Sequence, residues 1–378
     1  MSSYNYAKYV GAAITSVLNQ TFTDFELFIV DDASTDESWT VIQSFTDPRI
    51  HSFRNATNSN DKERMREIVF QMATGEYIAV HHSDNLWEPE KLQRQVAFLE
   101  AHPDVGAVFT NAQIIDEDGE PLQDKTHSYY KIFDQPNRSR YEWLNYFFYK
   151  GNALCHPSVL IRKKCYEECG FYRRGFAQIP DFDMWVRLCM KYEIHVLPEK
   201  LVRFRVLHDE MYSSGNRPET RIRGGFEFLQ VLDHYLTIPT YEDLVKIFPS
   251  AQKYYRPDGC DTGYVLGMVA VEAPVNHPWL HLFGLELLFK AINDPDRARK
   301  ISQLYGFTHK DFIALTAMHD VFSLENITNL NKQLSEVKSG AIWSLGMRLR
   351  AIRLWLAPPS SRRDRLVRLA LGKLMRRH

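Results

Sequence analysis

Apolar residues recur in two different patterns along the first part of this 378-residue chain. Residues 6–18 carry apolar side chains three and four positions apart, which predicts an amphipathic helix. Leu27–Val30 is a short, wholly apolar run of strand-favouring residues, as expected of a strand buried on both faces of a parallel sheet. Ser34 and Glu37 have the spacing of a capping box, which predicts that the next helix begins at Ser34.

The alternation of helices and buried strands continues to Thr110. Such an alternation indicates a doubly wound α/β sheet, mostly parallel and flanked by helices. Ligands of these sheets bind beyond the carboxyl ends of the strands, so candidate functional residues are sought there. Further helices are expected over 61–72 and 89–101, further strands over 50–53, 77–80 and 105–110, and a hairpin turn at Asp118-Gly119.

The pattern changes after residue 215. Long amphipathic stretches separated by proline-containing joints replace the strand-like runs, which predicts a mainly helical region. Residues 1–215 are therefore expected to form the α/β domain, 216–338 a helical domain, and 339–378 a basic amphipathic tail. No signal peptide opens the chain, and no apolar run approaches the roughly eighteen residues of a membrane-spanning helix.

Charge is distributed unevenly along the chain. The formal net charge is −1, but ten Lys and Arg residues stand against one acid between Arg348 and His378. This leaves 36 basic and 46 acidic residues before Arg348, a net charge of −10. An acidic body argues against nucleic acid as the main ligand, because phosphate binding needs a basic face. Five cysteines without a CxxC pair or a regular framework indicate reduced cytosolic thiols.

Acidic residues follow the first predicted strand. Asp32 lies just beyond Leu27–Val30, where a carboxylate can accept hydrogen bonds from a base N–H or a ribose hydroxyl. Tyr4 precedes the first helix, and its ring can stack on a base. The alternative is that Asp31, Asp32 and Ser34 cap the following helix.

A second acidic turn, His81–Asn85, follows the strand expected over 77–80. Asp84 suits a hard divalent cation, which takes one or two carboxylates together with diphosphate oxygens. His81 and His82 fit manganese, which accepts imidazole better than magnesium does. The alternative is that both histidines are solvent-exposed turn residues.

Asp181 and Asp183 lie at the start of a predicted helix that includes Met184–Lys191. The helix dipole stabilises acids at this end, so N-capping is one reading of both residues. One of the two is also expected to act as a general base.

Several of these segments, in the order in which they occur, resemble family-2 inverting glycosyltransferases of the GT-A fold. The resemblance covers about residues 1–210. It rests on SYNYAKYV (3–10), SVLNQT (16–21), VDDASTD (30–36), ATGEYIA (73–79), the acidic turn with Leu86-Trp87, and DFDMWVRL (181–188).

The resemblance implies a role for each candidate residue. His82 stands where the family usually has the first aspartate of its metal motif, and Pro180 where a glutamate often precedes the catalytic aspartate. The family also usually has an apolar strand before the segment that begins here at Ser3. The implied roles are donor binding by Tyr4, Asp32, Arg66 and Ser83, metal binding by Asp84 and His82, and general-base catalysis by Asp181.

The implied reaction is metal-assisted transfer of one sugar from a nucleotide-diphosphate-sugar, with UDP or dTDP expected, to an acceptor hydroxyl of a glycan or lipid-linked glycan. Manganese or magnesium is the expected ion. Similar bacterial enzymes build surface polysaccharides, so a cytoplasmic location at the inner face of the membrane is expected. Single addition is expected because the Gln-x-x-Arg-Trp signature and membrane spans of processive synthases are absent.

Two alternatives belong to other classes of protein. The first is a non-catalytic domain that keeps the fold and binds a glycan or a protein partner. The second is a nucleotidyltransferase on a related sheet, for which the chain lacks a glycine-rich phosphate loop with a lysine.

Contact with a membrane is one of three readings of the basic tail. Leucine and isoleucine recur at helical spacing among arginines from Leu345 to Leu374. A basic amphipathic helix of this kind can lie on an anionic membrane surface. Packing on the acidic body and linkage to further domains are the alternatives.

Overall fold

The computed structural model describes residues 1–59, 62–207, 217–274 and 277–356. The second part of the expected tail, 357–378, lies outside the described residues. The chain divides into two compact units, Met1–Phe312 (unit 1) and Ile313–His378 (unit 2). The domain boundaries expected after residues 215 and 338 remain predictions.

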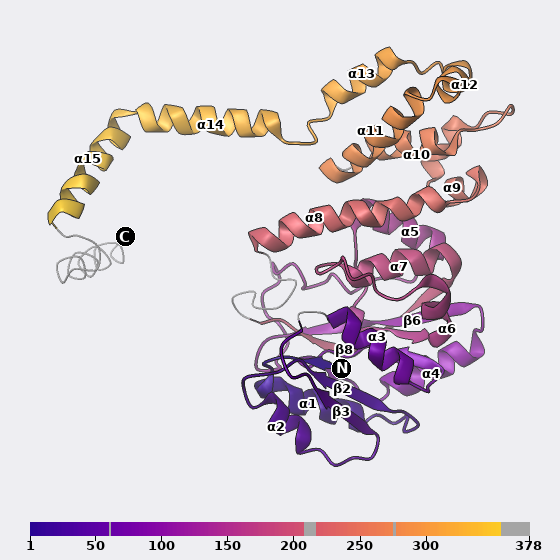
Figure 1. Cartoon of the computed structure of the whole chain (residues 1–378), viewed down its shortest axis with the longest axis vertical. Coiled ribbons are helices and arrows are strands. Elements are labelled where there is room, and N and C mark those ends of the chain that lie inside the picture. Colours follow the sequence, from indigo (N-terminus) through magenta and orange to yellow (C-terminus); the bar gives the residue numbers. More distant parts are fainter. Residues whose placement is uncertain (60–61, 208–216, 275–276, 357–378) are drawn as a thin grey trace. The chain divides into compact units, whose positions relative to one another are not determined.

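Unit 1 begins with a parallel sheet in the order β1-β2-β3, formed by β1 (Ser2–Ser3), β2 (Leu27–Asp31) and β3 (Ile50–Arg54). Every residue of β2 is buried, which explains its apolar sequence. Helices α1 (Ala7–Leu18) and α2 (Ser38–Gln43) pack against each other beside these strands (Figure 1).

A second, mixed sheet has the order β4-β7-β6-β8-β5. Its long pair β6 and β8 is parallel, whereas β7 and β5 pair with their neighbours in the antiparallel direction. A parallel bridge between Ser2 and His82 joins β1 to the turn after β4, so the carboxyl ends of β1, β2 and β4 meet at one edge. The strands are β4 (Tyr77–Ala79), β5 (Leu86–Trp87), β6 (Val105–Ile115), β7 (Leu160–Arg162) and β8 (Glu193–Arg205).

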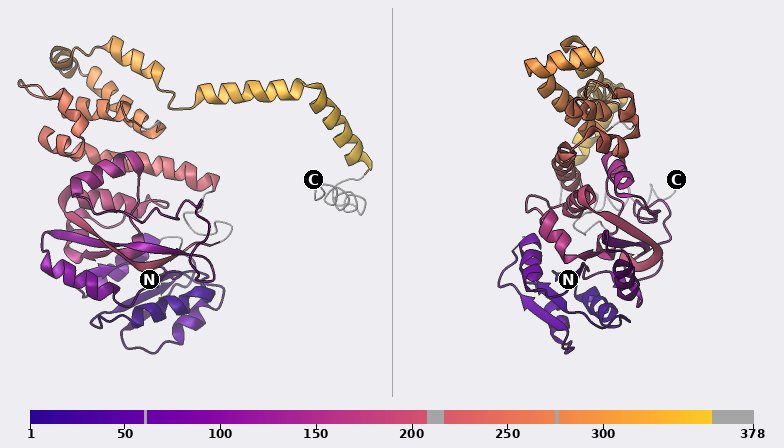
Figure 2. Two further views of the ribbon diagram at one scale, coloured as in Figure 1. Left: turned by 180° about the vertical axis from the view of Figure 1, so that it is seen from behind. Right: turned by 90° about the vertical axis from the view of Figure 1, so that its right-hand side faces the viewer.

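Helices flank the sheets as the sequence predicts. The views from both sides show α5, α7 and α8 gathered beyond β6 and β8, away from α1 and α2 (Figures 1 and 2). The α/β fold is therefore confirmed. The helices that precede α8 are α3 (Lys62–Met72), α4 (Lys91–Ala101), α5 (Arg140–Lys150), α6 (Lys163–Cys169) and α7 (Pro180–Lys191).

The turn between β2 and α2 differs from the prediction. Helix α2 begins at Ser38 rather than Ser34, and its N-cap residue Glu37 makes no capping bond, whereas Asp36 Oδ1 accepts from the N–H of Ser38 at 2.9 Å. The Ser34 hydroxyl donates to Asp31 and accepts the N–H of Asn5, so it is already used within the turn. Ala33 turns the chain here with a φ of 61°, a left-handed value that is uncommon for alanine. The capping-box prediction is therefore wrong.

A buried lysine lies under the sheet in α4. Lys91 is completely buried, donates from Nζ to Gln95 Oε1 at 2.7 Å, and lies 4.0 Å from the centre of the Trp87 ring. Gln95 in turn donates to the carbonyl oxygens of Val108 and Ser158. Burial lowers the pKa of Lys91 to about 7.

The helical region expected after residue 215 is confirmed. Helix α8 (Pro218–Leu232) packs against α7 and α11, and it approaches α11 so closely at Gly225 that a Cβ atom there would lie 2.5 Å from the Trp279 ring. The other helices of this region in unit 1 are α9 (Tyr241–Ile247), α10 (Thr262–Val271), α11 (Pro278–Ile292) and α12 (Pro295–Tyr305).

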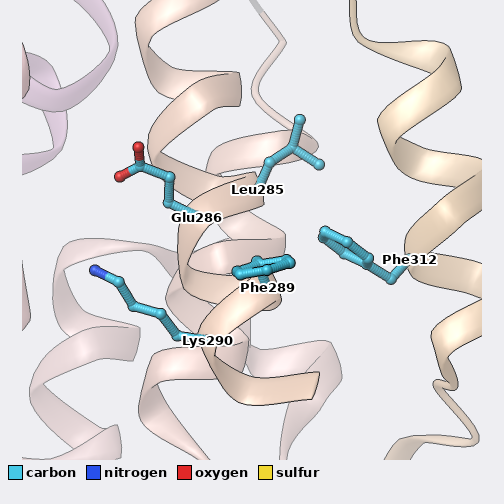
Figure 3. A pocket seen from close by; sticks show the side chains of 5 residues that line it. All are labelled: Leu285, Glu286, Phe289, Lys290 and Phe312. Carbon is cyan, nitrogen blue, oxygen red and sulfur yellow. The ribbon is translucent and has the colours of Figure 1, made fainter. Parts of the chain in front are cut away.

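An open groove of about 520 Å³ lies on α11. The rings of Phe289 and Phe312 face each other in it, with their centres 6.0 Å apart (Figure 3). Leu285, Glu286 and Lys290 complete the lining, and none of the residues expected at the site belongs to it.

Helix α13 (His309–Met318) spans the division between the units, and unit 2 continues with α14 (Leu324–Ser339) and α15 (Ala341–Leu356). Within the described ranges, no helix combines the length and the apolar character needed to cross a membrane.

Candidate active site

The carboxyl ends of β1 and β2 bring Tyr4 and Asp32 to one edge of the sheet. Tyr4 follows β1, and 40% of its surface is exposed, which leaves the ring accessible for stacking. Asp32 follows β2 and is only 4% exposed. Its Oδ1 accepts from Asn55 Nδ2 at 2.6 Å and from the N–H of Ser59 at 2.9 Å, so the carboxylate has a fixed orientation.

Asp31 has a structural role at the same edge. Its side chain is completely buried and accepts hydrogen bonds from the N–H and the hydroxyl of Ser34. Arg54 Nε lies 3.5 Å from Asp31 Oδ1. Asp31 thus closes the turn that presents Asp32, instead of capping a helix.

The two histidines of the acidic turn after β4 lie in different environments. His81 is buried, with its ring centre 4.4 Å from that of Trp87, and burial is the main reason that its pKa is far below the ordinary value. His81 is therefore a neutral core residue, and both readings given for it from the sequence are wrong. Ser83 is also buried, whereas His82 and Asp84 are half-buried.

Asp84 lies among groups that hold the turn in place. Its carbonyl oxygen accepts from Arg205 Nε at 2.8 Å, and Asn85 Oδ1 accepts from the Arg205 N–H at 2.7 Å. These bonds fasten the turn to the end of β8. Burial, followed by the negative charge of Asp84, raises the pKa of Tyr6, so this phenol stays protonated beside the carboxylate.

Asp181 lies in the first turn of α7 and is half-buried. Pro180 opens this helix, a position at which the missing N–H of proline costs nothing. Asn152 Nδ2 donates to Asp181 Oδ2 at 2.9 Å. The helix N-terminus and this amide both favour the ionised carboxylate, the form that can accept a proton.

Asp183 is not an N-cap. Its carboxylate is completely buried and contacts Arg173, Arg187 Nη2 at 3.0 Å and His234 Nε2 at 2.8 Å. Burial raises the pKa of Asp183, but hydrogen bonds from His234 and Arg173 and the charge of Arg187 hold it below the ordinary value. The N-cap reading is wrong for Asp183 because the residue lies inside the helix and its carboxylate pairs with cations.

Three residues that the sequence analysis missed connect the two acidic regions. The rings of His82 and His156 meet edge-on with centres 5.2 Å apart, and His156 Nε2 lies 2.9 Å from Tyr172 Oη. Asn152 lies outside regular structure and His156 begins the short 3-10 helix His156–Ser158, so neither belongs to a run long enough to show apolar periodicity. The feature of the sequence that could have pointed to this segment is the His156-Pro157 pair.

Arg66 belongs to α3, but its side chain lies outside the described ones. The described part of the chain contains no group of three or more His, Cys, Asp or Glu side chains arranged to hold a metal ion. In the acidic turn, Asp84 and His82 are a half-buried carboxylate and imidazole.

Comparisons with known proteins bear on the family and the fold. Residues 1–169 match the model of the family described as Glycosyl transferase family 2. An uncharacterized glycosyltransferase of Nostoc sp. is 28% identical over 288 residues, which are 71% of this chain and 85% of that protein. The Escherichia coli UDP-Glc:alpha-D-GlcNAc-diphosphoundecaprenol beta-1,3-glucosyltransferase WfaP is 33% identical over 100 residues, 26% of this chain and 39% of WfaP.

A solved structure shares the fold. The crystal structure of S. aureus TarS 1-349 in complex with UDP-GlcNAc has a TM-score of 0.51 at 17% identity, over 80% of this chain and 89% of that one. The similarity therefore extends beyond residues 1–169. The family match over residues 1–169, the glycosyltransferase relatives and the shared fold together show a sugar-transferring enzyme with the GT-A fold, whose residues 1–169 resemble glycosyl transferase family 2.

Proposed function

We propose that the enzyme transfers one sugar from a nucleotide-diphosphate-sugar to an acceptor hydroxyl with inversion at the anomeric carbon. Tyr4 and Asp32 bind the donor base and ribose, with Ser83 and Arg66 assisting. Asp181 is the general base. Asp84, with His82, is the metal-binding pair.

One chain of contacts carries this proposal. His82 of the acidic turn touches His156, and the same short segment supplies Asn152, which binds the Asp181 carboxylate. The turn that suits a metal and diphosphate is thereby linked through two side-chain contacts to the carboxylate that suits a base. A glycosyl transfer needs these two functions on opposite sides of one reacting carbon.

The proposed step is a single displacement. The acceptor oxygen forms a bond to the anomeric carbon while its proton passes to Asp181. The bond between that carbon and the diphosphate oxygen breaks, and the electron pair leaves with the diphosphate. Asn152 orients the Asp181 carboxylate, and the N-terminus of α7 stabilises its charge until the proton arrives.

The donor set of the acidic turn fits a divalent cation. Asp84 supplies a half-buried carboxylate and His82 an imidazole, which favours manganese over magnesium. Such an ion, when bound, neutralises charge on the leaving diphosphate.

The name of WfaP supports a lipid-linked glycan as acceptor and UDP as the donor nucleotide, and dTDP remains the second candidate for the donor. We place the reaction at the cytoplasmic face of a bacterial membrane, in surface-polysaccharide synthesis. Helix α15 would then contact the anionic lipid surface, because Trp343, Leu345 and Trp355 are exposed on it and the segment contains no acid.

The test is hydrolysis of a panel of UDP-, dTDP- and GDP-sugars, with and without manganese. We expect one nucleotide class to be hydrolysed, faster with the metal. Asp84→Asn should abolish this hydrolysis with little change in melting temperature, because the side chain is half-exposed. Asp104→Asn, at an exposed acid elsewhere in unit 1, is the matched control and should behave as the wild type. Normal turnover of Asp84→Asn at saturating manganese would refute the metal assignment.

A further inference from the structure

A carboxylate from α8 holds the loop that leads into α7. Glu227 is 1% exposed and accepts hydrogen bonds from three consecutive backbone N–H groups. Its Oε1 accepts from Ala177 at 2.8 Å, its Oε2 accepts from Ile179 at 2.9 Å, and the N–H of Gln178 lies between both oxygens, at 3.2 and 2.9 Å. Both carboxylate oxygens are needed for this pattern, because each N–H requires an acceptor.

This loop determines where α7 begins and therefore where Asp181 lies. Ile179 is the N-cap residue of α7 and has no side-chain cap of its own, so Glu227 replaces the cap from another helix. Asp181 follows two residues later. A general base must reach the proton within hydrogen-bonding distance, and a shift of about 1 Å can cost about a hundredfold in rate.

The same part of the chain contacts α7 on the far side of Asp181. His234, just after α8, binds the Asp183 carboxylate, and the Phe228 ring of α8 stacks on Phe182 with ring centres 6.0 Å apart. Residues 227–234 therefore contact the chain both before and after Asp181. They lie beyond residues 1–169, which match the family model.

We infer that Glu227 is a positioning residue for the glycosyl transfer: it sets the place of Asp181 through the backbone of residues 177–179. The inference rests on the proposed function, because it assumes that Asp181 is the base. Glu227 touches neither donor nor acceptor in this role. Its loss should lower turnover and leave nucleotide binding intact, because Tyr4 and Asp32 lie on other elements.

The experiment uses Glu227→Gln in the full chain. Glutamine has the same shape, but one of its two terminal groups is a donor, which would oppose the backbone N–H groups at that end of the loop. Glu219→Gln makes the same chemical change at an exposed position of α8 and is the matched control. The readouts are the turnover number for hydrolysis of the fastest nucleotide-sugar in the panel, and the Kd of UDP with manganese, both well below the melting temperature.

For Glu227→Gln we expect turnover to fall about tenfold to a hundredfold, with the UDP Kd within about twofold of the wild type. Glu227→Asp keeps both acceptors on a shorter side chain and should recover part of the rate. A purely structural role would instead lower turnover and UDP binding together with the folded fraction. That result, or unchanged turnover, overturns the inference. If Glu227→Gln does not fold, the same two measurements, turnover and the Kd of UDP, are compared for Glu227→Asp.

Asp181→Asn separates this inference from the proposed function. If Asp181→Asn is inactive and Glu227→Gln is normal, only the positioning role fails. If Asp181→Asn is active, or if the wild type hydrolyses no donor, both the proposed function and the inference about Glu227 are wrong.

Discussion

The carboxyl end of β2 and the first turn of α7 each carry two aspartates, and each pair contains one completely buried acid. One member of each pair, Asp31 or Asp183, is completely buried and bound by side chains of its own fold. The other member, Asp32 or Asp181, lies at the site. In the first pair, the buried acid is held by the Ser34 hydroxyl and one arginine. In the second pair, two arginines and a histidine hold it.

The difference between the regions lies in how far along the chain the supporting groups are found. Asp31 takes its partners from within 23 residues, at Ser34 and Arg54. One of the partners of Asp183 is His234, 51 residues away. The partners of Asp31 therefore lie within the α/β part of the chain, whereas one partner of Asp183 comes from the helical region that follows it. In the proposed function, the buried acid of each pair fixes the backbone and its neighbour takes part in the reaction.

The largest effect is expected for Asp181→Asn. It should lower turnover by at least about a hundredfold and leave donor binding intact, because only proton acceptance is lost. Steady-state kinetics together with calorimetric titration of UDP would measure both quantities. A loss of UDP binding equal to the loss of turnover would contradict the division of labour between the two regions.

Asp183→Asn should mainly destabilise the fold. It leaves Arg173, Arg187 and His234 without a charged partner, at a cost of about 3–5 kcal/mol in the free energy of unfolding. Chemical denaturation would measure this change. If turnover per folded molecule falls more for Asp183→Asn than for Asp181→Asn, the roles of the two aspartates are reversed.

The same carboxylate gives stability a defined dependence on pH. Because the pKa of Asp183 is lowered in the folded protein, its contribution is fully present above the ordinary carboxyl pKa of about 3.9. That contribution is lost as the pH falls through the lowered folded value. The Asp183→Asn variant should lack this part of the acid transition.

A smaller effect is expected for the pair Asp31 and Asp32 at the carboxyl end of β2. Asp32→Asn removes a charged acceptor from the base or ribose and should weaken UDP binding about tenfold to a hundredfold, since a hydrogen bond to a charged group is worth about 1.5–3 kcal/mol. Asp31→Asn, its matched control, should lower stability and leave the Kd of UDP near the wild-type value. If Asp31→Asn and Asp32→Asn changed the Kd of UDP equally, the proposed difference in role between Asp31 and Asp32 would be wrong.

Deleting residues 341–378 should have the smallest effect on catalysis, less than about twofold on donor hydrolysis, because every side chain named in either aspartate pair lies in unit 1. Co-sedimentation with anionic liposomes should decrease in the truncated protein, as each basic residue near the surface contributes about 1 kcal/mol. Equal sedimentation of both proteins would exclude a membrane role for the tail.

Much of the fold could be predicted from periodicity alone. Buried strands such as β2 and amphipathic helices such as α1 carry strong local patterns, and both are confirmed. Strands β5 and β7 are two and three residues long, too short for a pattern, so the antiparallel pairs of the second sheet were not predicted.

The site was predictable where its residues follow strands. Tyr4, Asp32 and Asp84 lie at strand ends or in the turns that follow them, which sequence order reveals. The contacts of Asn152 and Glu227 were not predictable, because each is made with residues 29 or about 50 positions away, and the helical periodicity around Glu227 does not reveal its partners. The capping box at Ser34 was a wrong prediction because it rested on the spacing to Glu37 alone, whereas the Ser34 hydroxyl bonds to Asp31 and Asn5.

The buried Lys91 has a consequence for the heat of unfolding. Its pKa is about 7 in the folded protein, because burial disfavours the charge, and about 10.4 in an unfolded chain. Between these values the Lys91 side chain takes up a proton on unfolding, so its contribution to stability rises with pH across this range. The calorimetric enthalpy measured at pH 8.5 should therefore contain a contribution from the ionisation enthalpy of the buffer, and Lys91→Met should shift that buffer dependence by the share of about one proton, whereas buried thiols such as Cys155 contribute with the opposite sign.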